Sequence, residues 1–205
     1  MENQEYVWNR LAESWYNFRN KPEKFVIYFK ERYANKRGKI IDLGCGNCRN
    51  LIPFKDYYCY CVDFSKEMLD KAKLIQEKYN INLKLIRCDI SNLKKFEDSY
   101  FDYALMTASL HHLPNKELRL RALEELHRIL KKDGIALVTV WNKWQPRFLL
   151  SKKDNFVKWK VKNEIYYRYY YLFNYFELKR LIKENNFRIL KSKFGRNLIF
   201  IVKEI

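Results

Sequence analysis

Short apolar runs alternate along this chain with segments in which apolar residues recur at helical spacing. The runs predict strands, and the periodic segments predict amphipathic helices. The expected strands are 39–44, 57–64, 81–89, 99–108 and 135–141, and the expected helices are 65–80, 115–134 and 174–187. Two further runs, 188–194 and 197–204, flank Gly195 and predict a closing hairpin. Ser65 is expected as a helix N-cap, and Gly134 is expected to end the 115–134 helix.

This order of elements predicts an α/β fold with a mostly parallel sheet, which the closing hairpin makes mixed. The alternation continues without repeats or linkers, so residues 1–205 are expected to form one domain. It breaks only at 142–174, a stretch rich in Trp, Tyr, Lys and Arg. We interpret 142–174 as a basic, aromatic insertion near the functional site.

Acidic residues follow three successive strands. Asp42 comes just before the glycine turn of Gly44 and Gly46, Asp63 lies 21 residues later, and Asp89 ends the third strand. Ligands of such sheets bind at the carboxyl ends of the strands, where a carboxylate can hold ribose hydroxyls. A third glycine near position 49, expected for a dinucleotide, is absent. The pattern therefore predicts a nucleoside ligand without phosphates.

The segments "IIDLGCGN", "VDFS", "RCDI" and "FDYALMTASLHHL" resemble consecutive motifs of class I S-adenosylmethionine-dependent methyltransferases. The resemblance covers nearly the whole chain and departs from the family at Cys48, where the family has Gly. It implies a Rossmann-like, seven-stranded, mostly parallel sheet with a C-terminal antiparallel hairpin, and an N-terminal helical lid at 1–38. It also implies S-adenosylmethionine as cofactor. The residues expected to bind it are Asp42, Gly44, Cys45, Gly46, Asp63, Phe64, Asp89, Ile90 and Thr107.

Three longer segments resemble the tRNA wobble-uridine carboxymethyl methyltransferases: "VWNRLAESWYNFRNKP", "SLHHLPNKELRLRALEELHRILKKDG" with "VTVW", and "RYYYLFNYFELKRLI". This resemblance implies esterification of 5-carboxymethyluridine in the tRNA anticodon loop. It also implies a small zinc-binding activator that pairs with the edge strand Leu83 to Cys88. An arginine–aromatic–aromatic–histidine segment of that family corresponds here to 168–171, with Tyr171 in place of the histidine.

A carboxylate acceptor is already ionised at neutral pH, so its methylation needs positioning and positive charge rather than a general base. Arg19 and Arg168 are the expected anion-holding residues, although Arg19 can instead bind the cofactor's methionine carboxylate and Arg168 can instead stack on aromatic rings. His111 is the candidate base if a proton must be removed. His112, Trp141 and Tyr169 are expected to contact the acceptor.

Net charge strengthens the expectation of a nucleic-acid partner. The chain carries 41 Lys and Arg against 24 Asp and Glu, for a net charge of +17, and 17% of its residues are aromatic. Basic residues interleaved with aromatic ones suit single-stranded RNA. Two rival functions stay open: a methyltransferase for small molecules, and a non-catalytic RNA-binding subunit of the same fold.

The five cysteines all lie between positions 45 and 88. A four-thiolate zinc site built from 45, 48, 59 and 61 is one interpretation. We favour reduced thiols in the core and no metal, because these residues occupy a glycine turn and one strand face. The first 18 residues lack a secretory pattern and no apolar run is long enough for a membrane span, so a cytoplasmic protein without membrane contact is expected.

Overall fold

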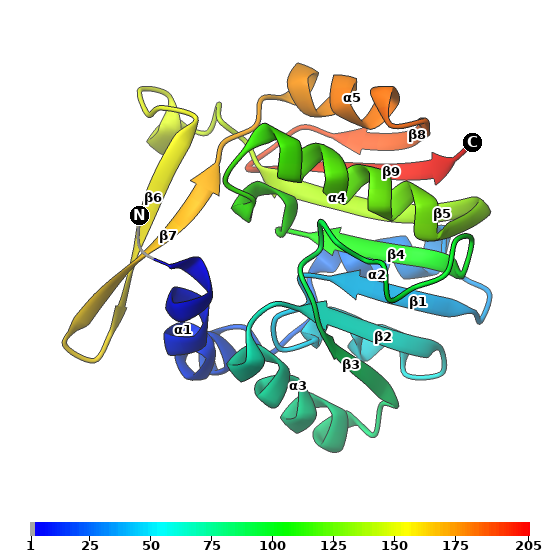
Figure 1. Ribbon diagram of the computed structural model, residues 1–205, viewed down its shortest axis with the longest axis horizontal. Helices are drawn as coiled ribbons and strands as arrows, with labels where there is room; N and C mark the ends of the chain where they lie inside the picture. Colours follow the sequence, from blue (N-terminus) through cyan, green and yellow to red (C-terminus); the bar gives the residue numbers. More distant parts are fainter. Residues whose placement is uncertain (1–2) are drawn as a thin grey trace.

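The computed structural model describes residues 3–205, which form a seven-stranded sheet, a separate hairpin and five α-helices (Figure 1). The helices are α1 (Gln4–Phe18), α2 (Lys24–Arg32), α3 (Lys66–Tyr79), α4 (Lys116–Ile129) and α5 (Tyr175–Glu184). The strands are β1 (Lys39–Leu43), β2 (Tyr58–Asp63), β3 (Leu83–Arg87), β4 (Phe101–Thr107), β5 (Leu130–Trp141), β6 (Asp154–Val161), β7 (Glu164–Tyr171), β8 (Phe187–Lys193) and β9 (Asn197–Glu204). Short 3-10 turns η1 (Arg49–Phe54), η2 (Leu110–His112) and η3 (Pro146–Phe148) complete the chain.

The large sheet has the strand order β3-β2-β1-β4-β5-β9-β8. Its first five strands run parallel, whereas β9 pairs antiparallel with both β5 and β8. The predicted Rossmann-like sheet with a C-terminal antiparallel hairpin is therefore confirmed. The order reverses between β1 and β4, which is where open α/β sheets bind ligands.

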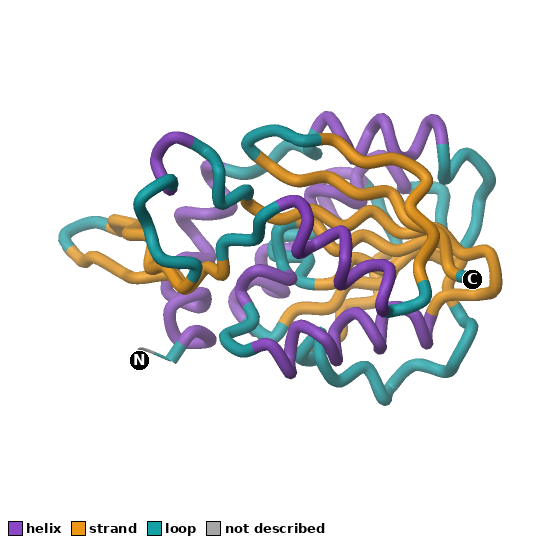
Figure 2. The backbone as a smooth tube through the Cα atoms, turned by 90° about the horizontal axis from the view of Figure 1, so that it is seen from above, coloured by secondary structure: helices purple, strands orange, loops and turns teal. Residues whose placement is uncertain are grey.

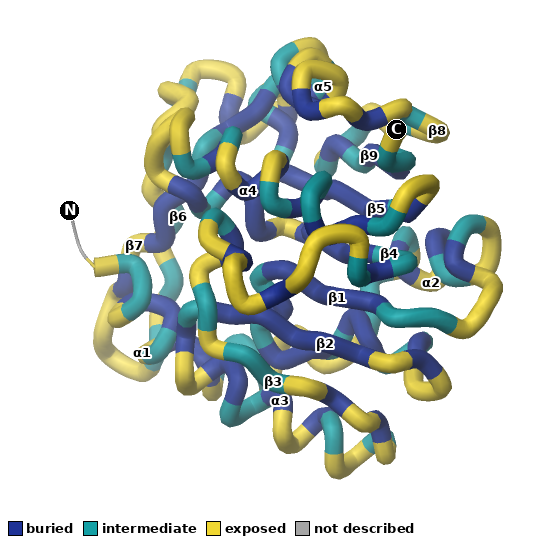
Figure 3. The backbone as a smooth tube through the Cα atoms, turned by 45° about the vertical axis from the view of Figure 1, so that its right-hand side comes forward, coloured by how far each residue is buried: buried dark blue, intermediate teal, exposed yellow. Residues whose placement is uncertain are grey.

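The sheet buries a separate apolar cluster on each face. On one face α4 and α5 pack against residues such as Ile41, Met106 and Phe200. On the other, α2, α3 and η1 pack against residues such as Ile40, Leu105 and Ile201. These strand residues alternate between the two clusters, as the period of two along a strand requires. Figure 2 shows helices along both faces of the sheet, and Figure 3 shows the central strands buried.

The helix predicted at 115–134 ends earlier than expected, so the role given to Gly134 is wrong. The helix stops at Ile129, and Leu130 is extended, paired with Phe101 and buried. Core burial of Leu130 in the sheet outweighs the helical pattern of the polar residues that follow it. Gly134 instead lies inside β5, near its start.

Residues 142–174 contain a hairpin that the sequence did not predict. β6 and β7 pair antiparallel from Asp154–Tyr171 to Val161–Glu164 and form a two-stranded sheet of their own. The hairpin projects from the main sheet beside α1 (Figures 1 and 2). Its inner face joins α1 in an apolar cluster with Val7, Trp8 and Leu11. The hairpin and α1 together form a wall at the end of the sheet where the first five strands finish.

Within residues 3–205, none of the helices combines the length and the apolar character that crossing a membrane requires.

Candidate active site

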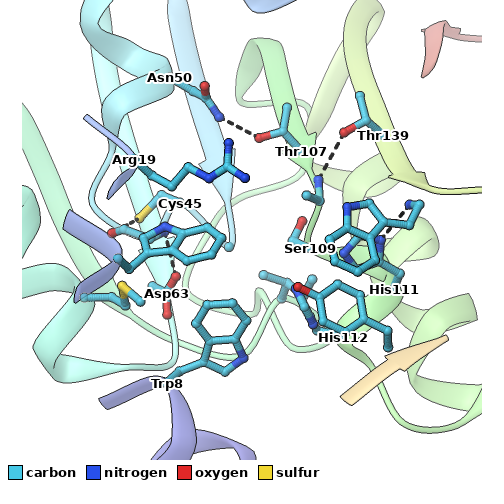
Figure 4. Close-up of a pocket in the computed structure, with 18 of the residues that line it drawn as sticks. Trp8, Arg19, Cys45, Asn50, Asp63, Thr107, Ser109, His111, His112 and Thr139 are labelled. Carbon is cyan, nitrogen blue, oxygen red and sulfur yellow. Dashed lines mark hydrogen bonds between the residues drawn. The ribbon is translucent and has the colours of Figure 1, made fainter. Parts of the chain in front are cut away.

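A cavity of about 670 Å³ opens at the carboxyl ends of the parallel strands, in the usual size range of ligand pockets. Side chains from the ends of β1, β2, β4 and β5 form its floor, and α1 with Trp8 and Trp15 covers it. Figure 4 shows Asp63 and Cys45 on one side of the cavity and His111 and His112 on the other. We call these the cofactor half and the acceptor half.

The glycine turn after β1 leaves no space for side chains at its first glycine. Gly44 has a φ of +73°, and a Cβ there would lie 2.4 Å from the Cβ of Ser109. The amides of Gly44 and Cys45 both donate to the Val62 carbonyl, which holds the turn against the end of β2. Only glycine combines this backbone conformation with this close approach.

Asp63 anchors the cofactor half. One carboxylate oxygen accepts the Gly46 amide at 2.8 Å, and the other accepts the Ser65 amide at 2.9 Å. Burial raises the pKa of Asp63 to about 6, although these backbone donors oppose the shift. The carboxylate is therefore ionised at neutral pH and keeps lone pairs for a ligand's hydroxyl groups.

Most of the predicted cofactor residues line the cavity. They are Gly44, Cys45, Gly46, Asp63, Phe64, Asp89, Ile90 and Thr107. Asp42 is the exception: it is fully buried below the turn, and neither of its oxygens has a hydrogen-bond partner within the described residues. Desolvation raises the pKa of Asp42 strongly. Its contact with a cofactor stays a prediction.

Arg168 lies one layer behind the cavity wall. Its guanidinium carbon is 4.7 Å from the Trp159 ring centroid and 5.7 Å from that of Trp8, and Nη1 donates to the Tyr170 hydroxyl at 2.6 Å. The side chain is almost fully buried, and its Nε has no partner within the described residues. The cation–π alternative is thus observed, and the anion-holding role becomes a prediction that Arg168 acts through Tyr170.

His111 has no free lone pair with which to act as a base. Its Nδ1 accepts the Trp141 amide at 2.9 Å, so the proton resides on Nε2. Burial and the neighbouring charges lower the pKa of His111 well below its ordinary value. The ring is neutral at physiological pH and presents only a donor.

His112 has the opposite tautomer. Its Nδ1 donates to the Tyr169 carbonyl at 2.8 Å, which leaves Nε2 as an acceptor. Burial is the main reason why the pKa of His112 falls to about 3. Both histidines line the cavity, but neither is a competent base near neutral pH.

The predicted stacking residues divide between the two faces of β7. Trp141 lines the cavity and stacks on Tyr170, with ring centroids 4.0 Å apart. Tyr169 points to the other face, where its hydroxyl donates to the Pro114 carbonyl, and it is not among the cavity residues. Tyr170 therefore occupies the place expected for Tyr169.

Comparison with known proteins agrees with this geometry. A family model described as a methyltransferase domain matches residues 41–138. A methyltransferase-named protein of Encephalitozoon cuniculi is 29% identical over 184 residues, which cover 86% of this chain and 82% of that protein. The tRNA (carboxymethyluridine(34)-5-O)-methyltransferase of Saccharomyces cerevisiae is 32% identical over 142 residues, 67% of this chain and 48% of that protein. Its Schizosaccharomyces pombe namesake is 26% identical over 97% of this chain and 94% of that protein.

A solved structure agrees in fold over nearly the full length. It is the 1,6-didemethyltoxoflavin-N1-methyltransferase of Burkholderia thailandensis with bound S-adenosylhomocysteine, with a TM-score of 0.70 and 17% identity over 97% of this chain and 88% of that one. This chain is a class I S-adenosylmethionine-dependent methyltransferase. Its methyl donor is S-adenosylmethionine.

The cofactor half of this methyltransferase fits that donor. The glycine turn admits a ligand close to the backbone, and the ionised Asp63 offers acceptors for two ribose hydroxyls. Asp89 holds its own loop through Ser91, at the edge where a purine amino group would lie.

Sequence reasoning missed several cavity residues. Asn50 donates to Thr107 at 2.8 Å, and Ser109 packs against the glycine turn. Arg196 reaches the cavity from the β8–β9 turn, and Arg147 reaches it after η3 begins. Arg147 had been noticed only as one member of a basic stretch, and nothing in the local pattern marks Arg196, because its position depends on how the last hairpin folds back.

Proposed function

We propose that this methyltransferase esterifies the carboxylate of 5-carboxymethyluridine at the wobble position of tRNA. The observation that carries the proposal is an excess of positive charge in the acceptor half. Arg19 and Arg147 line the cavity, and both lie close enough to Arg168 to lower its pKa further after burial has lowered it. An anionic acceptor would relieve this mutual repulsion.

Few carboxylates compensate these arginines. Among residues 3–205, Arg147 and Arg168 form no ion pair, and Arg19 meets only Glu23, at 3.9 Å. Glu23 is shared with Arg49, which it contacts more closely, at 2.7 Å. Charged hydrogen bonds between guanidinium and carboxylate groups are among the strongest polar contacts in proteins. The cavity therefore favours a carboxylate over a neutral acceptor.

The protonation states of the histidines suit a nucleophile that needs no deprotonation. S-adenosylmethionine, when bound, supplies a methyl group on a sulfonium sulfur that a carboxylate can attack directly. Neutral His111 has only an Nε2 proton to offer, and His112 is too weak a base to remove one from an amine or hydroxyl. The chain's task is then to hold and align the acceptor.

The outer face of the β6–β7 hairpin offers a surface for the RNA. Lys158 and Lys160 are exposed there, and they pair across the strands with Tyr167 and Ile165. Tyr167 and Phe156 are about two-fifths exposed on the same face. Cationic side chains beside exposed rings can contact phosphates and unstacked bases together.

The proposal includes an activator protein at the β3 edge. β3 pairs only with β2, so its other side offers free backbone groups. Leu85 and Ile86 are half-buried there, between the exposed Lys84 and Arg87. Edge strands of this kind accept an added strand from a partner. Co-expression with a zinc-binding activator should raise the yield and the activity of the methyltransferase; a fully active monomer that the activator leaves unchanged would remove it from the proposal.

The function itself is tested with labelled S-adenosylmethionine and bulk tRNA that lacks wobble methyl esters, with and without the activator. The tRNA is digested and then treated with mild base. Methanol released from wobble uridine would support ester formation on the proposed nucleotide. Cofactor binding without label in tRNA would favour a small-molecule acceptor, and failure to bind the cofactor would favour a non-catalytic RNA-binding subunit.

A further inference from the structure

Three cysteine side chains meet beneath the glycine turn. Cys45 belongs to the turn itself, Cys48 precedes η1, and Cys61 lies in β2. All three are buried, and their sulfur atoms lie within 4.8 Å of one another. Cys59, which shares a strand face with Cys61, stands apart, because its thiol donates to the Phe54 carbonyl. The structure therefore groups three thiols rather than the four that a structural zinc site would require.

The backbone at Cys48 is strained. Its φ is +59° and its ψ is +18°, the left-handed conformation that glycine adopts freely and cysteine does not. Residues held in this conformation store of order 1 kcal/mol or more, and they gather at functional sites. Glycine would remove the strain, so the thiol of Cys48 is the feature that the position retains at a cost.

The surroundings favour a cation. Asp42 is fully buried beside the cluster, close enough for its charge to interact with Cys45 and Cys61. Neither of its oxygens has a partner among residues 3–205. A buried carboxyl group without hydrogen bonds is costly, and a positive ion nearby would lower that cost.

We propose that Cys45, Cys48 and Cys61 form a three-coordinate site for a soft monovalent cation, Cu(I). Thiolates select Cu(I) among soft ions, and three sulfurs complete a trigonal site. Zn²⁺ in structural sites takes four ligands, and the described residues bring no fourth one to this cluster. Each thiol that coordinates as a thiolate releases its proton to solvent, and no oxidation or reduction takes place. Cys45 also lines the cofactor cavity, so the two sites adjoin.

The test is an anaerobic titration of the full chain with Cu(I) held by the coloured chelator bathocuproine disulfonate. Wild-type protein should remove one equivalent from the chelator and gain a sulfur-to-copper charge-transfer band in the ultraviolet. Cys48→Gly relaxes the backbone and removes one ligand, so it should fold but bind Cu(I) at least roughly a hundredfold more weakly. Cys59→Ser, an equally buried cysteine outside the cluster, should bind as the wild type does.

Three results would overturn the proposal. The first is Cu(I) binding that Cys48→Gly leaves unchanged or that Cys59→Ser reduces equally. The second is preferential retention of one Zn²⁺ in competition with Cu(I). The third is fewer than five free thiols in the anaerobic, denatured protein, which would show a disulfide in the cluster instead. A thermal melt of both variants verifies that lost binding does not reflect lost structure.

Discussion

The cofactor half and the acceptor half of the cavity are built in different ways. In the cofactor half, backbone amides and single side chains at strand ends do the work, as in the Gly46 and Ser65 amides on Asp63. In the acceptor half, the groups are side chains stacked several layers deep: Trp141 on Tyr170, and Arg168 among Trp8, Trp159 and Tyr170. The first depends on local chain geometry and the second on contacts between distant segments. Substitutions should therefore damage cofactor binding in one half and turnover in the other.

The largest effect is expected at Gly44. Gly44→Ala places a methyl group 2.4 Å from Ser109 in a conformation that alanine disfavours, and should destabilise the fold by about 2–4 kcal/mol and abolish cofactor binding. Gly195→Ala is the matched control, because its new Cβ meets nothing closer than 3.7 Å. Thermal unfolding of both variants is the measurement. Equal melting temperatures would show that the turn is not the rigid element described.

Arg168 tests the acceptor half. Arg168→Ala removes the charge behind Tyr170 and should lower kcat by roughly a hundredfold through misplacement of the acceptor, with little change in cofactor affinity. Arg168→Lys should restore only part of kcat, since an ammonium cannot stack as a guanidinium does.

Arg10→Ala is the control for that experiment, because Arg10 binds the same hairpin through Tyr166 and Glu164 on its exposed side. It should retain nearly full turnover. If Arg168→Ala instead weakened cofactor binding and left kcat intact, the division between the halves would fail.

Asp63 tests the cofactor half. Asp63→Asn should weaken S-adenosylmethionine binding by roughly tenfold while kcat at saturation stays nearly unchanged. Because the pKa of Asp63 is about 6, wild-type affinity should fall as the pH drops from 7 to 5, and the variant should show no such fall. Calorimetric titration across that range measures both. A flat wild-type profile would remove the Asp63 carboxylate from cofactor binding.

The same group has the opposite effect on fold stability. Its pKa is raised above the ordinary value of 3.8, so the folded state holds the proton more tightly than the unfolded state. The resulting stabilisation is full below pH 3.8 and is lost as the pH rises through 6. Between these values, cofactor affinity should rise while the contribution of Asp63 to stability declines.

The smallest effect is expected on the outer hairpin face. Lys158→Ala should weaken tRNA binding a few-fold and reduce the slope of log affinity against log salt by about 0.9, the value for one lost phosphate contact. Lys132→Ala, an exposed lysine near the start of β5, should change neither. Filter binding at several salt concentrations is the measurement. Identical slopes for both variants would show that the RNA does not contact this face.

The two halves also differ in how far the sequence could predict them. The strands, the glycine turn and the carboxylates at Asp63 and Asp89 follow from short local patterns, and the structure places them as expected. The β6–β7 hairpin did not follow, because its alternating aromatic and basic residues lie within a stretch that looks like an irregular insertion. Which of Tyr169 and Tyr170 faces the cavity depends on the register of that hairpin, and the sequence pattern leaves the register open.

The central claim is that the acceptor half is built for a carboxylate. It is tested most directly by two anticodon stem-loops that differ only at the wobble uridine, one with a carboxymethyl group and one with the uncharged carbamoylmethyl group of nearly equal size. With labelled S-adenosylmethionine and activator present, the account predicts base-labile label in the carboxymethyl substrate alone. Comparable transfer to the carbamoylmethyl substrate, or transfer to neither while the cofactor binds, would contradict it.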